Sequence, residues 1–199
     1  MPDARTVIER RTWRLAFLLT GNAGAATSLI DRINKLQKHP ESLEPALLDR
    51  LIVQNSRGLP KARAEALPPA PGIPDTAPAA AALAAALSLG HQPLEAWMLK
   101  RIDDLDDLHI ARAMDCSKTA LRLHLSSADE RLATLLGEKL LPSTAALRAY
   151  ADALDPAPLI IAHREEFRRQ RAKRLKRRAI IAAAALLLLA FAILKILLS

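Results

Sequence analysis

Few residues in this chain have the types and the spacing that catalysis or metal binding needs. Cys116 is the single cysteine, which excludes an internal disulfide and a cysteine-rich zinc site. The acidic stretch from Asp103 to Asp107 lacks the glycine and the distal glutamate of a calcium loop. The sequence contains no Ser-His-Asp order, phosphate-binding loop or dinucleotide fingerprint. The histidines, which lack the spacing that brings two imidazoles to one metal ion, are His39, His91, His109, His124 and His163. We therefore expect no enzyme activity, no metal site and no cofactor.

The densest charge lies in a basic run between residues 164 and 178. It holds nine of the 29 lysines and arginines against only Glu165 and Glu166, and so carries +7 of the chain's net charge of +8. The high isoelectric point therefore describes this run rather than the rest of the chain. Such a density of cations attracts phosphates, so a nucleic-acid patch is one interpretation. The position just before an apolar segment favours another, contact of Arg168 to Arg178 with anionic lipids.

Residues 179–199, AIIAAAALLLLAFAILKILLS, carry one charge, at Lys195 near the far end. A helix of this length extends about 30 Å, the thickness of a hydrocarbon core, so we predict a single transmembrane helix. A buried core helix is the alternative, but a terminal position behind a basic run disfavours it. Basic residues that flank a span stay on the cytoplasmic side. We therefore expect residues 1–178 in the cytoplasm, and we expect no signal peptide in the charged stretch MPDARTVIERRTWRLAFLLTG.

The composition and the position of helix-breaking prolines predict an all-α protein built from two small modules. Apolar residues make up 51% of the chain but aromatic ones only 3%, which favours helices over sheets. The Pro-rich stretch LPPAPGIPDTAP interrupts any helix, and we place a Pro/Ala-rich linker at residues 61–78. This linker separates helical modules at residues 1–60 and 79–141. A helical, basic juxtamembrane segment, residues 142–178, then leads to the span.

The first module has helix-spaced apolar residues in three runs. The chain breaks at TGNAGA after the first run and at His39-Pro40 after the second, so we predict three helices between residues 5 and 58. A core of about 55 residues is marginal by itself. We therefore expect the two modules to rely on each other or on a partner.

The second module has the pattern of a helix-turn-helix. The helix LEAWMLKRI is followed by the turn DDLDD, the helix LHIARAMD, a corner at Cys116-Ser117 and a long helix. Ser117 is a suitable N-cap for the long helix, and Ala111 is small enough for a close crossing of the two helices. The long helix carries an inward stripe at spacings of four and three, namely Leu121, Leu125, Ala128, Leu132 and Leu135. We predict that Ile110, Ala111 and Met114 face this stripe.

The stretch PLEAWMLKRIDDLDDLHIARAMDCSKTALRLHLSSADERLATLLG resembles the C-terminal promoter-reading domain, region four, of the extracytoplasmic-function (ECF) RNA polymerase sigma factors. The first module looks like a shortened region two of this bacterial family, in RLAFLLTGNAGAATSLIDRI and LLDRLIVQNSRG. Together the two matches cover most of residues 10–137. The resemblance implies promoter DNA and core RNA polymerase as partners, here at the bacterial inner membrane. The residues that it would turn toward DNA are Lys118, Thr119, Arg122, Ser126 and Ser127.

The chain departs from the family mainly in its charges. Where the family has an acidic DLVQ that docks on polymerase, residues 28–31 read SLID. Residues 94–136 hold six basic and eight acidic side chains, a net charge of −2. Among the family's cationic positions on the long helix Arg122 alone keeps a full positive charge, and Asp129 adds a repulsive one. Asp115 replaces a corner glycine, and aspartate tolerates a left-handed backbone. Because phosphate neutralisation supplies much of DNA affinity, we expect weak DNA binding.

Two functions from different classes fit this pattern. The first is a membrane-anchored, sigma-factor-like transcription regulator that binds promoter DNA, RNA polymerase or both through the helix-turn-helix. The second is a degenerate sigma fold that serves as a protein-interaction module at the cytoplasmic membrane, as a decoy or adaptor for a regulatory partner. The resemblance favours the first function, and the charges favour the second.

Overall fold

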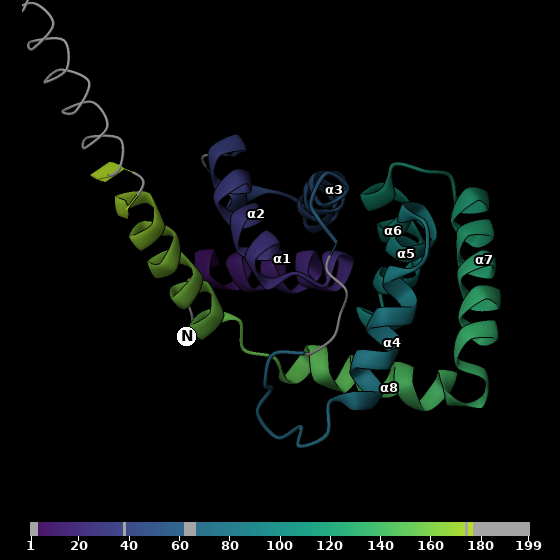
Figure 1. The fold of residues 1–199 in the computed structure, drawn as a ribbon. Helices are drawn as coiled ribbons and strands as arrows, with labels where there is room; N and C mark the ends of the chain where they lie inside the picture. Colours follow the sequence, from purple (N-terminus) through teal and green to yellow (C-terminus); the bar gives the residue numbers. More distant parts are fainter. Residues whose placement is uncertain (1–3, 38, 62–66, 174, 177–199) are drawn as a thin grey trace, which may run out of the picture. The chain divides into compact units, whose positions relative to one another are not determined.

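The computed structural model of the chain describes residues 4–37, 39–61, 67–173 and 175–176. In these residues all the regular structure is helical, without a strand, which confirms the predicted all-α class (Figure 1). The described residues up to Pro158 form one compact unit, and the described residues from Leu159 onward form a second unit. The transmembrane helix predicted at 179–199 lies outside the described residues. Among the helices that are described, none is long and apolar enough to cross a membrane.

Three helices form the first part of the compact unit. They are α1 (Ala4–Thr20), α2 (Ala23–Leu36) and α3 (Pro45–Ser56), with the 3-10 turn η1 (Pro40–Ser42) before α3. Gly21 turns the chain between α1 and α2 with a φ of 65°, and the side chain of Asn22 caps α2. Their core contains Trp13, which stacks on Phe17 and donates its indole N–H to the Thr27 hydroxyl at 2.9 Å. The two breaks predicted from the sequence therefore separate three helices, as expected.

The following helices include the helix-turn-helix. In chain order they are α4 (Ala77–Leu87), α5 (His91–Trp97), the π-helical η2 (Met98–Ile102), α6 (Asp107–Met114), α7 (Lys118–Leu136), the 3-10 turn η3 (Gly137–Lys139) and α8 (Leu140–Ala153). The predicted helix LEAWMLKRI corresponds to α5 and η2, and α6 meets α7 at the predicted corner. α8 packs against α4 (Figure 1). The start of the segment 142–178 is therefore part of the compact unit.

The buried side of α7 follows the predicted stripe with one exception. Leu121, Ala128 and Leu132 are fully buried, and Leu125 is half-buried. Leu135 was expected inside but is 50% exposed. It lies in the last turn of α7, beside the corner that leads into η3. Helical periodicity identifies the side of a helix that faces the core, but it does not show where the neighbouring helices end.

The described part of the linker is attached to the compact unit. Residues 67–76 contain no helix, as their prolines require. The hydroxyl of Tyr150 in α8 donates a hydrogen bond to the carbonyl of Pro68 at 2.9 Å, and Ala70 is buried. Gly72 turns the chain with a φ of 74°. These contacts attach the linker to the compact unit at Pro68 and Ala70.

The helix-turn-helix packs against the first three helices through α3 and α6. Ile52 and Val53 of α3 are fully buried, as are Ile110 and Ala113 of α6. Both predicted modules lie within the compact unit of residues 1–158. A module of about 55 residues buries little apolar surface by itself. Packing the two modules together increases the surface that each one buries.

Candidate nucleic-acid interface

Side-chain caps at the start of both helices hold the corner between α6 and α7. Asp106 accepts hydrogen bonds from two backbone N–H groups in the first turn of α6, both at 2.9 Å, and these bonds keep the pKa of its carboxyl below the ordinary value. Ser117 accepts from the N–H of Ala120 at 3.1 Å and caps α7, as predicted. Between the caps, Asp115 has a left-handed backbone, with φ 57° and ψ 47°. These local features fix the direction in which α7 leaves the corner.

The residues that the resemblance assigns to DNA lie along one broad side of α7. All of them are exposed, namely Lys118, Thr119, Arg122, Ser126 and Ser127. With 3.6 residues per turn, Thr119, Ser126 and Ser127 fall on the side opposite the buried stripe. Arg122 and Lys118 lie on its flank, about 100° and 60° around the helix from Leu121. The hydroxyl of Ser126 donates a hydrogen bond to Glu130 one turn further on, at 2.9 Å. We refer to this exposed side as the outer face of α7.

The two cations of the outer face form no ion pair with a carboxylate in the described part of the chain. Asp107, at the start of α6, is paired instead with Lys100 at 2.8 Å. The pKa of Asp107 is lowered first by that hydrogen bond and charge, and to a smaller extent by the charges of Arg122 and Lys118. Lys118 and Arg122 therefore point positive charge at the solvent beside the corner.

Six of the eight carboxylates in residues 94–136 form ion pairs. The pairs are Glu95 with Arg57, Asp103 with Arg11 and Arg14, Asp104 with Arg148, Asp107 with Lys100, Asp115 with Arg50, and Asp129 with Arg101. Four of these six acids take their partners from outside residues 94–136. The net charge of −2 that the segment carries by count is therefore not the charge that its outer face presents.

A buried ion cluster that no sequence signal marks joins α1, α3 and α6. Asp49 of α3, 3% exposed, accepts from two nitrogens of Arg11 at 3.1 and 2.9 Å and lies 2.9 Å from Nε2 of His109. Arg11 also reaches Asp103 at 2.6 Å. Burial raises the pKa of Asp103, and the charges of Arg11 and Arg14 oppose that shift. The partners of Asp49 are 38 and 60 residues away along the chain, so no local pattern identifies the cluster.

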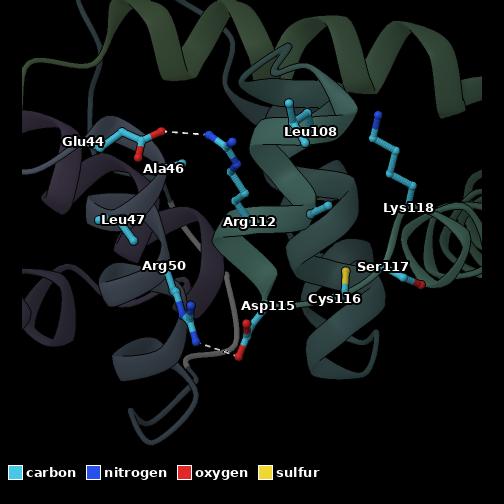
Figure 2. A pocket seen from close by; sticks show the side chains of 11 residues that line it. Glu44, Ala46, Leu47, Arg50, Leu108, Arg112, Asp115, Cys116, Ser117 and Lys118 are labelled. Atoms are coloured by element: carbon cyan, nitrogen blue, oxygen red, sulfur yellow. Dashed lines mark hydrogen bonds and ion pairs between the residues drawn. The ribbon is translucent and has the colours of Figure 1, made fainter.

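An open groove of about 610 Å³ lies between α3 and the corner of the helix-turn-helix (Figure 2). Leu47 and Leu108 line it and are 46% and 48% exposed. The ion pair of Glu44 with Arg112, at 2.9 Å, joins α3 to α6 beside them, as the dashed line in Figure 2 shows. Cys116 also lines the groove, and burial raises the pKa of its thiol. The groove thus offers two exposed leucines between charged side chains.

The basic run belongs to the second unit, in which residues 159–173 are helical. The cations that the structure describes as exposed are Arg168, Arg169, Arg171, Lys173 and Lys176. Arg169 forms an ion pair with Glu165 one turn earlier, at 3.7 Å. Phe167 and Leu175 are also exposed, 58% each. Three further cations of the run, Arg174, Arg177 and Arg178, lie outside the described residues.

Within the described residues, no group of three or more His, Cys, Asp or Glu side chains is arranged to hold a metal ion. Comparisons with protein-family models, with curated proteins and with solved structures find no match to this chain. The outer face of α7 and the groove beside it are therefore the features from which a function can be inferred.

Proposed function

We propose that this protein is a membrane-anchored regulator of transcription initiation, of the ECF sigma-factor type, that binds duplex DNA through the outer face of α7. One observation carries the proposal. Lys118 and Arg122 are exposed and form no ion pair in the described residues, whereas Asp107, Asp115 and Asp129 are paired with other cations. The first two turns of α7 thus present two cations although the segment is acidic by count, and the acid Glu130 lies further along the helix, where it accepts from the Ser126 hydroxyl.

The side chains of the outer face have the chemistry that a DNA major groove needs. A lysine neutralises phosphate, and an arginine donates two hydrogen bonds to O6 and N7 of guanine. The hydroxyls of Thr119, Ser126 and Ser127 can bond to phosphates or to base edges. The major groove is about 12 Å wide and admits an α-helix. The capped corner supports the proposal further, because it holds α7 at a fixed angle to α6.

The apolar segment 179–199 would anchor this regulator in the inner membrane, with the basic run against anionic lipids on the cytoplasmic side. Core RNA polymerase is the protein partner that the sigma-type hypothesis implies. Residues 28–31, SLID, stand where polymerase docking would occur, and they lack the first acid and the glutamine of the family pattern. Polymerase contact is for this reason tested separately from DNA binding.

The test is DNA binding by the full chain in lipid nanodiscs, in excess non-specific competitor DNA. Sites are first selected from a randomised duplex library, and binding is then measured for Arg122→Ala and Lys118→Ala. Arg131→Ala is the matched control, since it removes the same charge from an exposed position of the same helix, about half a turn around it from Arg122. Loss of selective binding in Arg122→Ala, with the control unchanged, supports the proposal. Selective binding that is indifferent to Arg122 contradicts it.

A second candidate function, a protein-interaction module at the membrane, is favoured by the exposed leucines of the groove. Leu47 and Leu108 would contact an apolar segment of a regulatory protein. The two candidates are distinguished by co-purification from detergent-solubilised membranes. A partner lost in Leu108→Arg but kept in Arg122→Ala supports the adaptor. Core polymerase subunits that co-purify with the chain support the sigma-type regulator.

A further inference from the structure

Leu123 is an apolar side chain in the middle of the polar outer face of α7, and it is 67% exposed. Thr119 lies one turn before it, Ser126 and Ser127 lie one turn after it, and Arg122 is its neighbour in the chain. The other exposed leucines of the compact unit have different surroundings. Leu47 and Leu108 line the groove, Leu36 is the last residue of α2, and Leu135 and Leu141 lie where α7 leads into α8.

A side chain as exposed as Leu123 adds little to folding, because the hydrophobic effect rewards only the area removed from water. The same side chain becomes favourable when a ligand covers it. The charges around Leu123 restrict which ligand that can be. An apolar protein surface placed over Leu123 would also cover Arg122, and a buried cation without a counter-charge is costly. A polyanion that encloses this side of α7 covers the leucine and neutralises Arg122 on its flank at the same time.

In the major groove of DNA the C5-methyl group of thymine is the apolar group that base edges present. Leu123 follows Arg122 by one residue, a rise of about 1.5 Å along the helix, while base pairs are about 3.4 Å apart. Successive side chains also point about 100° apart around the helix. In a groove about 12 Å wide that encloses the helix, the two can therefore reach base edges of neighbouring base pairs. This spacing places an apolar contact beside a guanine contact.

We propose that Leu123 is a sequence-reading residue that packs against the C5-methyl of a thymine next to the guanine bound by Arg122. This inference rests on the proposed DNA binding by the outer face. It names the base that the face prefers and the atom that is read. Because the contact is apolar, it discriminates thymine from uracil, which has the same hydrogen-bonding groups and lacks the methyl.

The experiment uses the full chain in nanodiscs and the duplexes selected as described above. Each thymine of the selected site is replaced in turn by deoxyuridine, and binding is measured for the wild type and for Leu123→Ala. Burying one methyl group corresponds to about a fourfold change in affinity. We expect one thymine whose replacement weakens wild-type binding by about fourfold. The same replacement should leave the affinity of Leu123→Ala unchanged.

Leu135→Ala is the matched control, since Leu135 is an exposed leucine of the same helix, more than three turns further on. It should keep the sensitivity to the thymine methyl. Circular dichroism checks that all variants keep their helix content. One outcome overturns the role of Leu123 and leaves the proposed function standing. In it, selective binding depends on Arg122, but no uracil replacement lowers the affinity of the wild type more than that of Leu123→Ala. Failure to select any duplex, or selection that ignores Arg122, overturns both.

Discussion

Arg101 of η2 and Asp129 of α7 form an ion pair of 2.5 Å, which holds the carboxylate that stands two helical turns beyond Arg122. Asp129 and Arg122 are seven residues apart and so lie on the same side of the helix. By sequence, Asp129 is the group that repels DNA from the outer face. In the structure its carboxylate is paired with Arg101, whose side chain is 47% exposed. Changing Asp129 therefore changes two charges at the outer face.

We predict that Asp129→Arg strengthens DNA binding and makes it more salt-dependent. The change adds one cation and frees Arg101 from its partner, and each new phosphate contact steepens the slope of log K against log salt by about 0.9. Asp129→Asn frees Arg101 without adding a charge, so its slope should lie between those of wild type and Asp129→Arg. The measurement is affinity against salt concentration. Glu138→Arg in η3 makes the same change in total charge, and an equal gain from it would mean that the position of the charge does not matter.

Deleting residues 179–199 should move the protein from the membrane to the soluble fraction without loss of helix in residues 1–158. The reason is that the compact unit ends at Pro158, before the apolar segment begins. Fractionation and circular dichroism of the truncated chain measure the two effects. A reporter that is active only in the cytoplasm should work when fused before Met1 and fail when fused after Ser199. The reverse pattern would contradict the predicted orientation.

Asp49→Ala should destabilise the truncated chain by about 2 to 3 kcal/mol, because the half-buried Arg11 keeps only Asp103 as a partner and the ring of His109 loses its acceptor. Urea unfolding followed by circular dichroism measures the loss. Glu138→Ala, an exposed control, should change stability by no more than about 0.5 kcal/mol. If Asp49→Ala matches this control, the buried cluster does not hold α3 to α6.

Cys116 should react slowly with an alkylating agent at neutral pH in the folded protein. Burial raises the pKa of its thiol above the ordinary value of 9.0, and the charges of Asp115 and Glu95 raise it further. Because the folded chain holds this proton more tightly than the unfolded chain, stability contributed by the thiol is present below pH 9 and falls as the pH rises through the folded pKa. Alkylation should be several-fold faster in urea. Asp115→Asn should speed the reaction of the folded chain, and Asp129→Asn should not.

The helices and the corner of this protein follow from its sequence. The cap at Ser117, the left-handed Asp115 and the stripe of Leu121, Ala128 and Leu132 each depend on residues a few positions apart. Interactions between residues so close in the chain can be predicted from the sequence pattern. For the same reason, the exposure of Lys118 and the other candidate residues on α7 could be predicted. The apolar segment after a basic run is likewise a local signal, although the helix that it predicts lies outside the described residues.

The charge of the outer face was decided only by the tertiary structure. Arg50 of α3 neutralises Asp115 of the corner, and Arg57 neutralises Glu95, over separations that no helical period connects. A count of charges within residues 94–136 therefore leaves out the cations from other helices that pair with its acids. The attachment of the linker through Tyr150 and Pro68 was hidden in the same way, since the two are 82 residues apart. The energy of an ion pair depends on the distance between the two charges. That distance is set by how the helices pack, and the order of residues in the chain does not show it.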